Sequence, residues 1–230
     1  MYKHQHYPSK ILNFFFTFFL HSDPEGDVYT LDGQARHKLT FLNSLGIPTR
    51  LILIGHSIGC YLLLKMLDHL PMEGLLHCVM LFPTVERLAL SPSGYYATPL
   101  AKYFRWMVWP SVWMVSSVLP QSLILTLLRK WYFHGRNNVS GAVQATYKLV
   151  HANSASLVAQ LGHLEMQEVV ELDSEVVARY QDKMTWYYGV DDHWCPTNYY
   201  EDMRARFPRM DVRLCAVRCE HAFVFKIVRQ

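Results

Sequence analysis

The 230-residue sequence lacks the features that mark several large classes of protein. Its cysteines are five, an odd number, and none forms a C-x-x-C pair. This argues against a disulfide framework and a zinc site, and it favours a reducing compartment. The net charge of only +3 comes without a basic run or a glycine-rich phosphate loop. Nucleic acid is therefore not an expected partner, and no metal or cofactor is expected.

The amino-terminal part lacks a hydrophobic run long enough to span a bilayer as a helix. The run from Ile11 to Leu20 is rich in phenylalanine, and the polar segment after it offers no small-residue cleavage site of a signal peptide. Bounded by Pro24 and Gly26, it predicts a buried strand instead. With 51% hydrophobic residues, the chain is expected to form one globular domain over residues 1–230.

What the sequence does contain is the pattern G-x-S-x-G, formed by Gly55, Ser57 and Gly59. The apolar block 51–54 before it predicts a strand buried on both faces, and the apolar spacing over 61–67 predicts a helix after it. A serine at such a tight turn is held in strained backbone geometry, and the residues two positions away must lack a Cβ. The pattern in this context predicts a nucleophilic serine.

Two later loops offer an acid and a base at the carboxyl ends of predicted strands. The strand 184–189 leads to Asp191 and Asp192, and the strand 211–217 leads to His221. His221 would accept the proton of the serine, and an aspartate would hold the imidazole in the required tautomer. Either aspartate satisfies this spacing, whereas His193 lies in the wrong loop to be the base. His151 and His163 show no metal-ligand spacing, and His56 is interpreted as a filler residue at a tolerant position of the turn, so none of the three receives a role.

These segments together resemble the lipid droplet-associated hydrolases, a family of α/β-hydrolases. The resemblance runs collinearly from about Asp27 to Phe225, and its Gly-x-x-Asp-x-Trp register favours Asp192 over Asp191. It implies an α/β-hydrolase-like parallel sheet with helices on both faces and the triad Ser57, Asp192 and His221. The resemblance rests on residues 51–59, 81–87, 187–192, 194–196 and 221–223.

The resemblance also implies an activity and a place in the cell. We expect hydrolysis of lipid carboxylic esters, such as sterol esters or other neutral lipids, through an acyl-enzyme and without a cofactor. The expected partners are the ester substrate and the surface of lipid droplets or the cytosolic side of the endoplasmic reticulum membrane. The alternative is a droplet surface protein with weak or no catalysis.

One departure from the family pattern concerns the amino end. The family has several strands before the helix predicted at 27–45, and a loop among them supplies a second oxyanion N–H. Residues 1–26 contain no such glycine-containing loop, so the chain is expected to be shortened there. Only the N–H of Ile58 is then assigned as an oxyanion donor, and the strand at 11–20 should cover part of the exposed sheet edge.

A helical cap insertion is expected over residues 88–170, and its centre is unusual. Residues 106–128 contain no charged side chain but hold Trp106, Trp109 and Trp113. Pro110 and Pro120 are expected to break any single helix. One interpretation is a cap of buried helices over the active site. The other is a helical hairpin that enters a lipid monolayer, with the tryptophans at the polar boundary, and the resemblance favours it.

Overall fold

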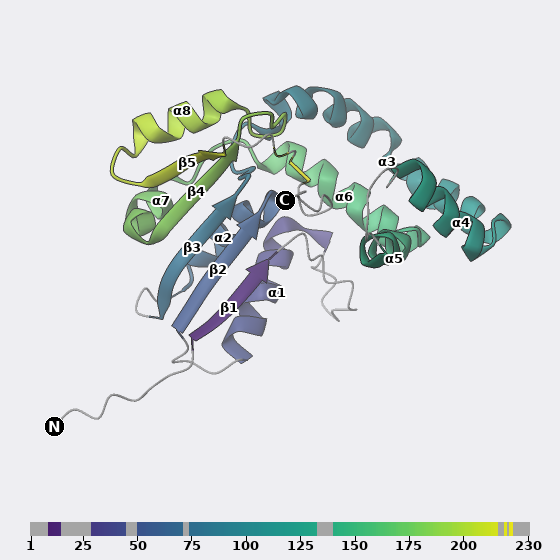
Figure 1. The fold of residues 1–230 in the computed structure, drawn as a ribbon, viewed down its shortest axis with the longest axis horizontal. Coiled ribbons are helices and arrows are strands. Elements are labelled where there is room, and N and C mark those ends of the chain that lie inside the picture. The colour runs from purple at the N-terminus through teal and green to yellow at the C-terminus, as the bar shows by residue number, and fades with distance from the viewer. Residues whose placement is uncertain are drawn as a thin grey trace.

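A five-stranded parallel sheet in the order β1-β2-β3-β4-β5 forms the centre of the molecule (Figure 1). The computed structural model describes residues 9–14, 29–44, 50–70, 74–132, 140–215, 219, 221 and 222. The strands are β1 Ser9–Phe14, β2 Arg50–His56, β3 Leu75–Leu81, β4 Met184–Gly189 and β5 Asp211–Cys215.

The edge strand β1 pairs in parallel with β2, with Ser9 opposite Arg50 and Phe14 opposite Gly55. The sequence predicted a strand at 11–20 that covers this edge, and the pairing confirms it over residues 11–14, with the strand beginning two residues earlier at Ser9. Residues 15–20 lie outside the described part of the chain.

The helices between the strands pack on one face of the sheet: α1 Leu31–Ser44, α2 Ile58–Leu67, α7 Ser174–Tyr180 with the short η4 Gln181–Lys183, and α8 Thr197–Arg206. The strand order advances one step at a time, and right-handed crossovers then bring every connecting helix to the same side. Contacts agree with this. The hydroxyl of Tyr180 on α7 donates to the carbonyl of Leu67 on α2 at 2.8 Å, and Tyr200 on α8 meets Tyr188 of β4.

The side chains that face these helices form the core. Leu53, Met80 and Trp186 come from three adjacent strands and are all fully buried. On the opposite face, Ile54 and Tyr187 are only half-buried. The expectation that residues 51–54 are buried on both faces is met only in part, because Leu53 is fully buried whereas the other three residues of the block are half-buried. The α/β-hydrolase-like parallel sheet is as expected, but the part of the chain that the structure describes shows no second helical layer on that face.

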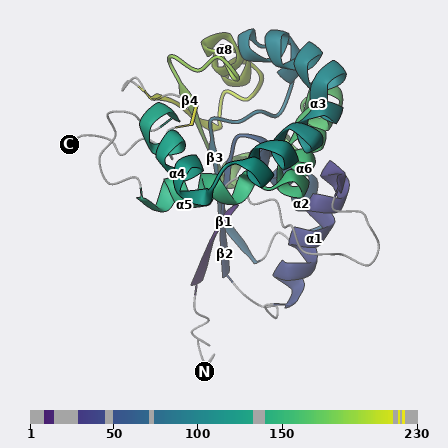
Figure 2. The ribbon, with the colours of Figure 1, turned by 90° about the vertical axis from the view of Figure 1, so that its right-hand side faces the viewer.

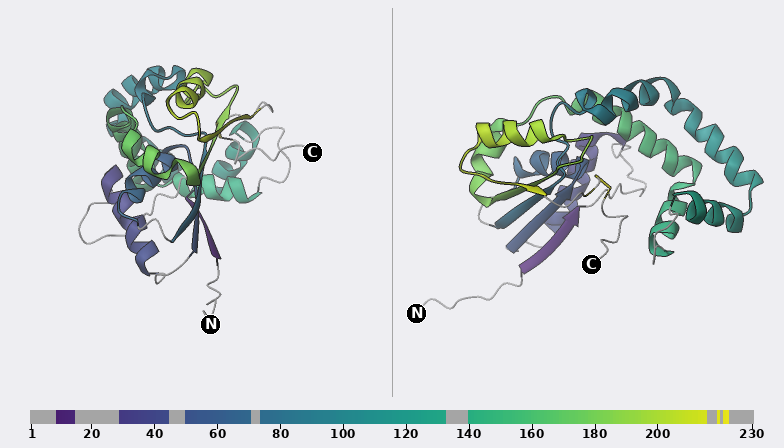
Figure 3. Two further views of the ribbon diagram at one scale, coloured as in Figure 1. Left: turned by 90° about the vertical axis from the view of Figure 1, so that its left-hand side faces the viewer. Right: turned by 45° about the horizontal axis from the view of Figure 1, so that its top comes forward.

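The insertion between β3 and β4 is helical, as expected, and extends away from the sheet (Figures 1 and 3). Its long helix α3 packs along α6, which returns the chain to the sheet (Figure 2). The insertion comprises η2 Leu88–Leu90, α3 Pro92–Val118, α4 Gln121–Leu127, η3 Leu128–Tyr132, α5 Ser140–Leu149 and α6 Ala152–Glu168.

The proline residues of α3 bend the helix without ending it. The helix runs through Pro99 and Pro110, so the expectation that Pro110 breaks it is wrong. An internal proline removes one backbone hydrogen bond and displaces the preceding turn, which the turns on either side accommodate as curvature. The break expected at Pro120 is confirmed, because α3 ends at Val118 and Pro120 occupies the N-cap position of α4.

No single helix in the described ranges has the length and apolar character needed to cross a bilayer. The pair formed by Pro92–Val118 and Gln121–Trp131 meets both criteria only when taken together, and it is bent by 116°.

Candidate active site

The turn between β2 and α2 holds Ser57 in a backbone conformation that few side chains adopt. Its φ is 56° and its ψ is −128°, and its N–H donates to the carbonyl of Leu81 on the neighbouring strand at 3.0 Å. A Cβ at Gly55 would lie 2.8 Å from Leu63 Cδ1 and 2.9 Å from the carbonyl oxygen of Gly59. The turn can therefore close only with glycine at position 55, which is the physical basis of the G-x-S-x-G pattern.

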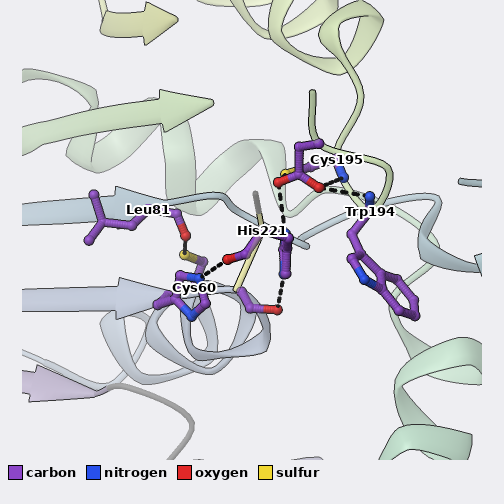
Figure 4. A network of polar contacts seen from close by, with 8 residues as sticks. Cys60, Leu81, Trp194, Cys195 and His221 are labelled. Carbon is purple, nitrogen blue, oxygen red and sulfur yellow. Dashed lines mark hydrogen bonds and ion pairs between the residues drawn. The ribbon is translucent and has the colours of Figure 1, made fainter. Parts of the chain in front are cut away.

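The three residues that the sequence singles out lie in hydrogen-bond contact. Ser57 Oγ is 2.7 Å from Nε2 of His221, and Nδ1 of the same ring is 2.7 Å from Oδ2 of Asp192 (Figure 4). Because a carboxylate accepts, Nδ1 carries the proton and Nε2 accepts the serine O–H. Of the two candidate aspartates, the structure brings Asp192 to the imidazole and leaves the side chain of Asp191 exposed.

The buried carboxylate of Asp192 is surrounded by donors. Oδ1 accepts the backbone N–H of Trp194 at 2.8 Å and that of Cys195 at 3.2 Å, and Oδ2 also accepts the thiol of Cys195 at 2.9 Å. Burial alone would raise the pKa of Asp192, but its interaction with His221 and the hydrogen bonds from Cys195 and Trp194 outweigh burial and leave the pKa below its usual value. The carboxylate is thus ionised at neutral pH. Burial also raises the pKa of the Cys195 thiol well above its usual value, so the thiol keeps the proton that it donates.

His56, which the sequence analysis gave no role, lies next to His221. Its buried ring is 5.3 Å from that of His221, and its Nε2 is 2.8 Å from the backbone carbonyl of His221. Burial lowers the pKa of His56 to about 4, so the ring is neutral and Nε2–H donates to that carbonyl. No sequence pattern predicts the contact of His56 or that of the Cys195 thiol. The sequence shows only that each residue is next to a motif.

Phe82 completes the wall beside the base, edge-on to the ring of His221 at 6.1 Å. It follows β3 with a φ of 49°, and its ring leaves no space for a Cβ at Gly189, which would lie 2.5 Å from it. The glycine that ends β4 is thus required by the packing of this wall.

Ile58 is the first residue of α2, directly after Ser57. The first N–H groups of a helix have no partner within it, and they favour negative charge. This position is consistent with the oxyanion role expected of the Ile58 N–H.

An apolar cavity of about 540 Å³ opens between this site and the insertion. Ser57 and His221 lie in its wall, so an ester bound there would meet the serine hydroxyl. Helices α3 and α6 supply most of its apolar lining, including Leu100, Phe104, Val108, Val158 and Met166.

The three tryptophans Trp106, Trp109 and Trp113 lie on α3 but outside this cavity. They are 69%, 44% and 55% exposed, and the last two stack with ring centroids 6.2 Å apart. Within α3 only Gly94 is buried. The interpretation of the insertion as buried helices therefore does not describe α3, which presents a large apolar surface.

Asp192, Cys195 and His221 also bring three metal-ligand types within 4.8 Å of one another. Each short contact among them is a hydrogen bond between a donor and the carboxylate. The hydrogen bonds account for the cluster without an ion. Within the described ranges, His151 and His163 belong to no such group.

A family model described as lipid-droplet associated hydrolase matches residues 14–224. This chain belongs to the lipid-droplet associated hydrolase family. Among relatives named lipid droplet-associated hydrolase, the human protein is 38% identical over 201 residues, which are 86% of this chain and 60% of that protein. The Drosophila melanogaster protein is 32% identical over 203 residues, which are 87% and 66%. The chain thus spans about 60% of the length of its curated vertebrate relatives.

Solved structures share the fold of this family member at low identity. A serine hydrolase from Cycloclasticus zankles superposes with a TM-score of 0.55 at 16% identity, covering 85% of this chain and 65% of that one. An α/β-hydrolase fold protein from Burkholderia ambifaria gives a TM-score of 0.56 at 13% identity, covering 89% and 71%. At these identities the comparison establishes the fold alone.

Proposed function

We propose that this chain is a serine hydrolase of lipid carboxylic esters. The observation that carries the proposal is the hydrogen-bonded series Ser57, His221 and Asp192, built on a strained strand-to-helix turn and open to an apolar cavity. A serine hydroxyl becomes a useful nucleophile only beside a base that a third group orients, and this arrangement supplies both.

The reaction would proceed through an acyl-enzyme. Ser57 Oγ attacks the ester carbonyl carbon while His221 Nε2 takes its proton, and Asp192 stabilises the imidazolium that forms. The N–H of Ile58 faces the oxygen that becomes negative. His221 then gives the proton to the departing alcohol. Water, deprotonated by the same nitrogen, releases the acid and restores Ser57.

The substrate and its location are proposed from the cavity, the surface of α3 and the relatives. The apolar lining fits sterol esters or other neutral lipids, and the relatives are named lipid droplet-associated. The exposed tryptophans on α3, together with the 116° bend to α4, fit a hairpin lying in the monolayer of a droplet or the cytosolic surface of the endoplasmic reticulum. Basic residues Lys102 and Arg129 near its ends fit the polar boundary.

A fluorophosphonate probe tests the proposal, because it labels only an activated serine. The wild-type protein should be labelled, and Ser57→Ala should abolish labelling. Asp192→Asn should slow labelling by about 10²–10⁴, since it favours the wrong imidazole tautomer. Asp191→Asn is the matched control and should label at the wild-type rate. Labelling that persists in Ser57→Ala would overturn the proposal.

The second candidate is a droplet surface protein with weak or no catalysis. It is favoured by the exposed apolar face of α3 and by Ile58 being the single oxyanion donor assigned among the described residues. Removing one such donor typically costs about 10²–10³ in turnover. A folded wild-type protein that binds droplets but does not react with the probe would support this candidate over the first.

A further inference from the structure

Two buried polar groups interrupt the apolar lining of the cavity beside Ser57. Thr84 follows β3 and Glu165 lies on α6, and both side chains line the same cavity as Ser57 and His221. They are 3% and 8% exposed. Thr84 Oγ1 and Glu165 Oε1 are fully enclosed, and neither has a hydrogen-bond partner among the described residues.

Glu165 is a neutral acid in this setting. Burial raises its pKa to about 8, so it is largely protonated at neutral pH. The guanidinium of Arg105 also lines the cavity, but it donates to Gln160 Oε1 and to the carbonyl of Lys102, each at 3.1 Å. Within the described chain, Glu165 Oε1 thus has no hydrogen-bond partner, and Arg105 is directed to other groups.

Such groups are costly to keep without a partner. A buried polar group that makes no hydrogen bond destabilises a protein by about 1–3 kcal/mol, and most native examples have a partner in a ligand or water. Two of them line one cavity beside a nucleophilic serine, where a bound molecule can supply the partners that the chain does not.

The chemistry of the two groups narrows what that molecule carries. A hydroxyl and a protonated carboxyl each offer one donor and at least one acceptor. The oxygens of a simple lipid ester only accept, so they would leave the acceptors of Thr84 and Glu165 unpaired. A hydroxyl group on the ligand both donates and accepts, so it can pair with both side chains without bringing a charge into the cavity.

We propose that the cavity selects lipid esters that bear a free hydroxyl group, which is bound by Thr84 and Glu165. The inference rests on the proposed function, because it assigns this cavity to an ester that Ser57 attacks. The hydroxyl has two chemical sources, the glycerol part of a partial glyceride and a hydroxylated acyl chain. Both present the same group to the cavity.

The test measures binding in a Ser57→Ala background, where no turnover occurs. A fluorescent fatty acid bound in the cavity is displaced by two matched pairs of ligands. Monooleoylglycerol, which carries hydroxyl groups on its alcohol part, is compared with propyl oleate, which carries none. Methyl ricinoleate, which carries a hydroxyl group on its acyl chain, is compared with methyl oleate, which does not. The hydroxylated member of at least one pair should bind at least tenfold more tightly, and the pair that responds identifies the source.

Substitutions assign the effect to the two residues. Glu165→Leu and Thr84→Val should each reduce the preference to within about twofold, whereas Glu165→Gln should retain most of it because an amide both donates and accepts. Glu168→Gln, a change on the same helix outside the cavity lining, is the control and should leave the preference unchanged. Equal affinities within both pairs, or a preference that survives Glu165→Leu and Thr84→Val in folded protein, would overturn the inference. Probe labelling of Ser57 in the unmutated chain reports separately on the proposed function.

Discussion

Asp192 is fixed by more than the imidazole that it orients. The N–H groups of Trp194 and Cys195 hold Oδ1, which leaves Oδ2 to His221 and to the Cys195 thiol. Because both oxygens are engaged, the carboxylate cannot rotate away from the ring. The site therefore depends on further side chains that contact Ser57, His221 and Asp192. Of these, His56 is the one whose contribution is simplest to measure by substitution.

Replacing His56 should impair the site without unfolding the protein. Its Nε2–H is the described side-chain donor to the carbonyl of His221, and His56→Phe would leave that carbonyl without it. A lost hydrogen bond of this kind is worth about 1 kcal/mol, so fluorophosphonate labelling should slow by roughly fivefold. The rate of labelling as a function of pH, with melting temperature measured in parallel, checks this.

His56→Gln is the matched control, because its amide can still donate to the carbonyl. We expect it to restore most of the labelling rate, and the pH profile of His56→Phe to shift relative to both. A His56→Phe protein that labels at the wild-type rate and pH profile would show that the residue only fills space.

The helices and strands that a short sequence pattern marks were predictable. The strand β2, the turn at Ser57 and the helix α2 follow from an apolar block, two glycines and an apolar stripe, all within eighteen residues of one another. The helix expected at 27–45 begins at Leu31 in the described chain, and of its apolar positions Leu31, Ala35 and Leu42 are buried while Leu39 is half-buried. Pro110 was misjudged because a proline penalty is local, whereas the length of α3 is set by packing along α6.

The candidate site also has residues that the sequence predicted and contacts that it could not predict. Ser57, Asp192 and His221 each sit at the end of a predicted strand, so motif and order located them. The contacts of His56 and of Glu165 depend on which distant segments meet. His56 reaches a carbonyl 165 positions away, and Glu165 meets the cavity through the approach of α6 to η2. No pattern in one sequence records such approaches.

The surface of α3 should determine attachment to lipid. Changing Trp106, Trp109 and Trp113 together to alanine removes exposed indole rings that would lie at the polar boundary of a monolayer. We expect binding to triolein emulsions coated with phospholipid to weaken by at least tenfold, measured by flotation. The fold should persist, because α3 contributes little to the core.

Tyr29→Ala is the control for that experiment, since Tyr29 is an equally exposed aromatic residue outside the insertion. It should leave flotation unchanged. If the triple variant floats with the emulsion as well as the wild-type protein does, α3 is not the lipid-binding surface.

In the whole molecule, each successive strand is added on the same side of the one before it. The buried side chains of the sheet are therefore concentrated on one of its faces. The described crossover helices pack on the face of Leu53 and Trp186, and the other face carries a polar row. There His77 Nε2 lies 2.8 Å from Thr185 Oγ1, which donates to Asp211 at 2.9 Å. The sequence could not reveal this asymmetry, because it follows from the direction in which successive strands are added.

Global stability should depend on pH through Glu165. The unfolded carboxyl has a pKa near 4.5, whereas burial raises the folded value to about 8. Between these values the folded state holds a proton that the unfolded state has released, so the contribution of Glu165 to stability is full below the lower pKa and is lost as pH rises. From pH 5 to pH 8 the loss amounts to as much as about 4 kcal/mol.

Glu165→Gln removes that titration, so its free energy of unfolding relative to the wild type should increase steadily from pH 5 to pH 8. Urea unfolding at each pH gives the difference. His56 acts in the opposite direction, since burial lowers its pKa to about 4 and its contribution is lost as pH falls below 6.5. His56 is present in both proteins, so its contribution cancels in the difference between their free energies of unfolding. Arg105 and His221, which line the same cavity, are likewise present in both proteins. Parallel stability curves for the two proteins would mean that Glu165 is ionised in the folded state, and the cavity would then hold a charge instead of a neutral acid.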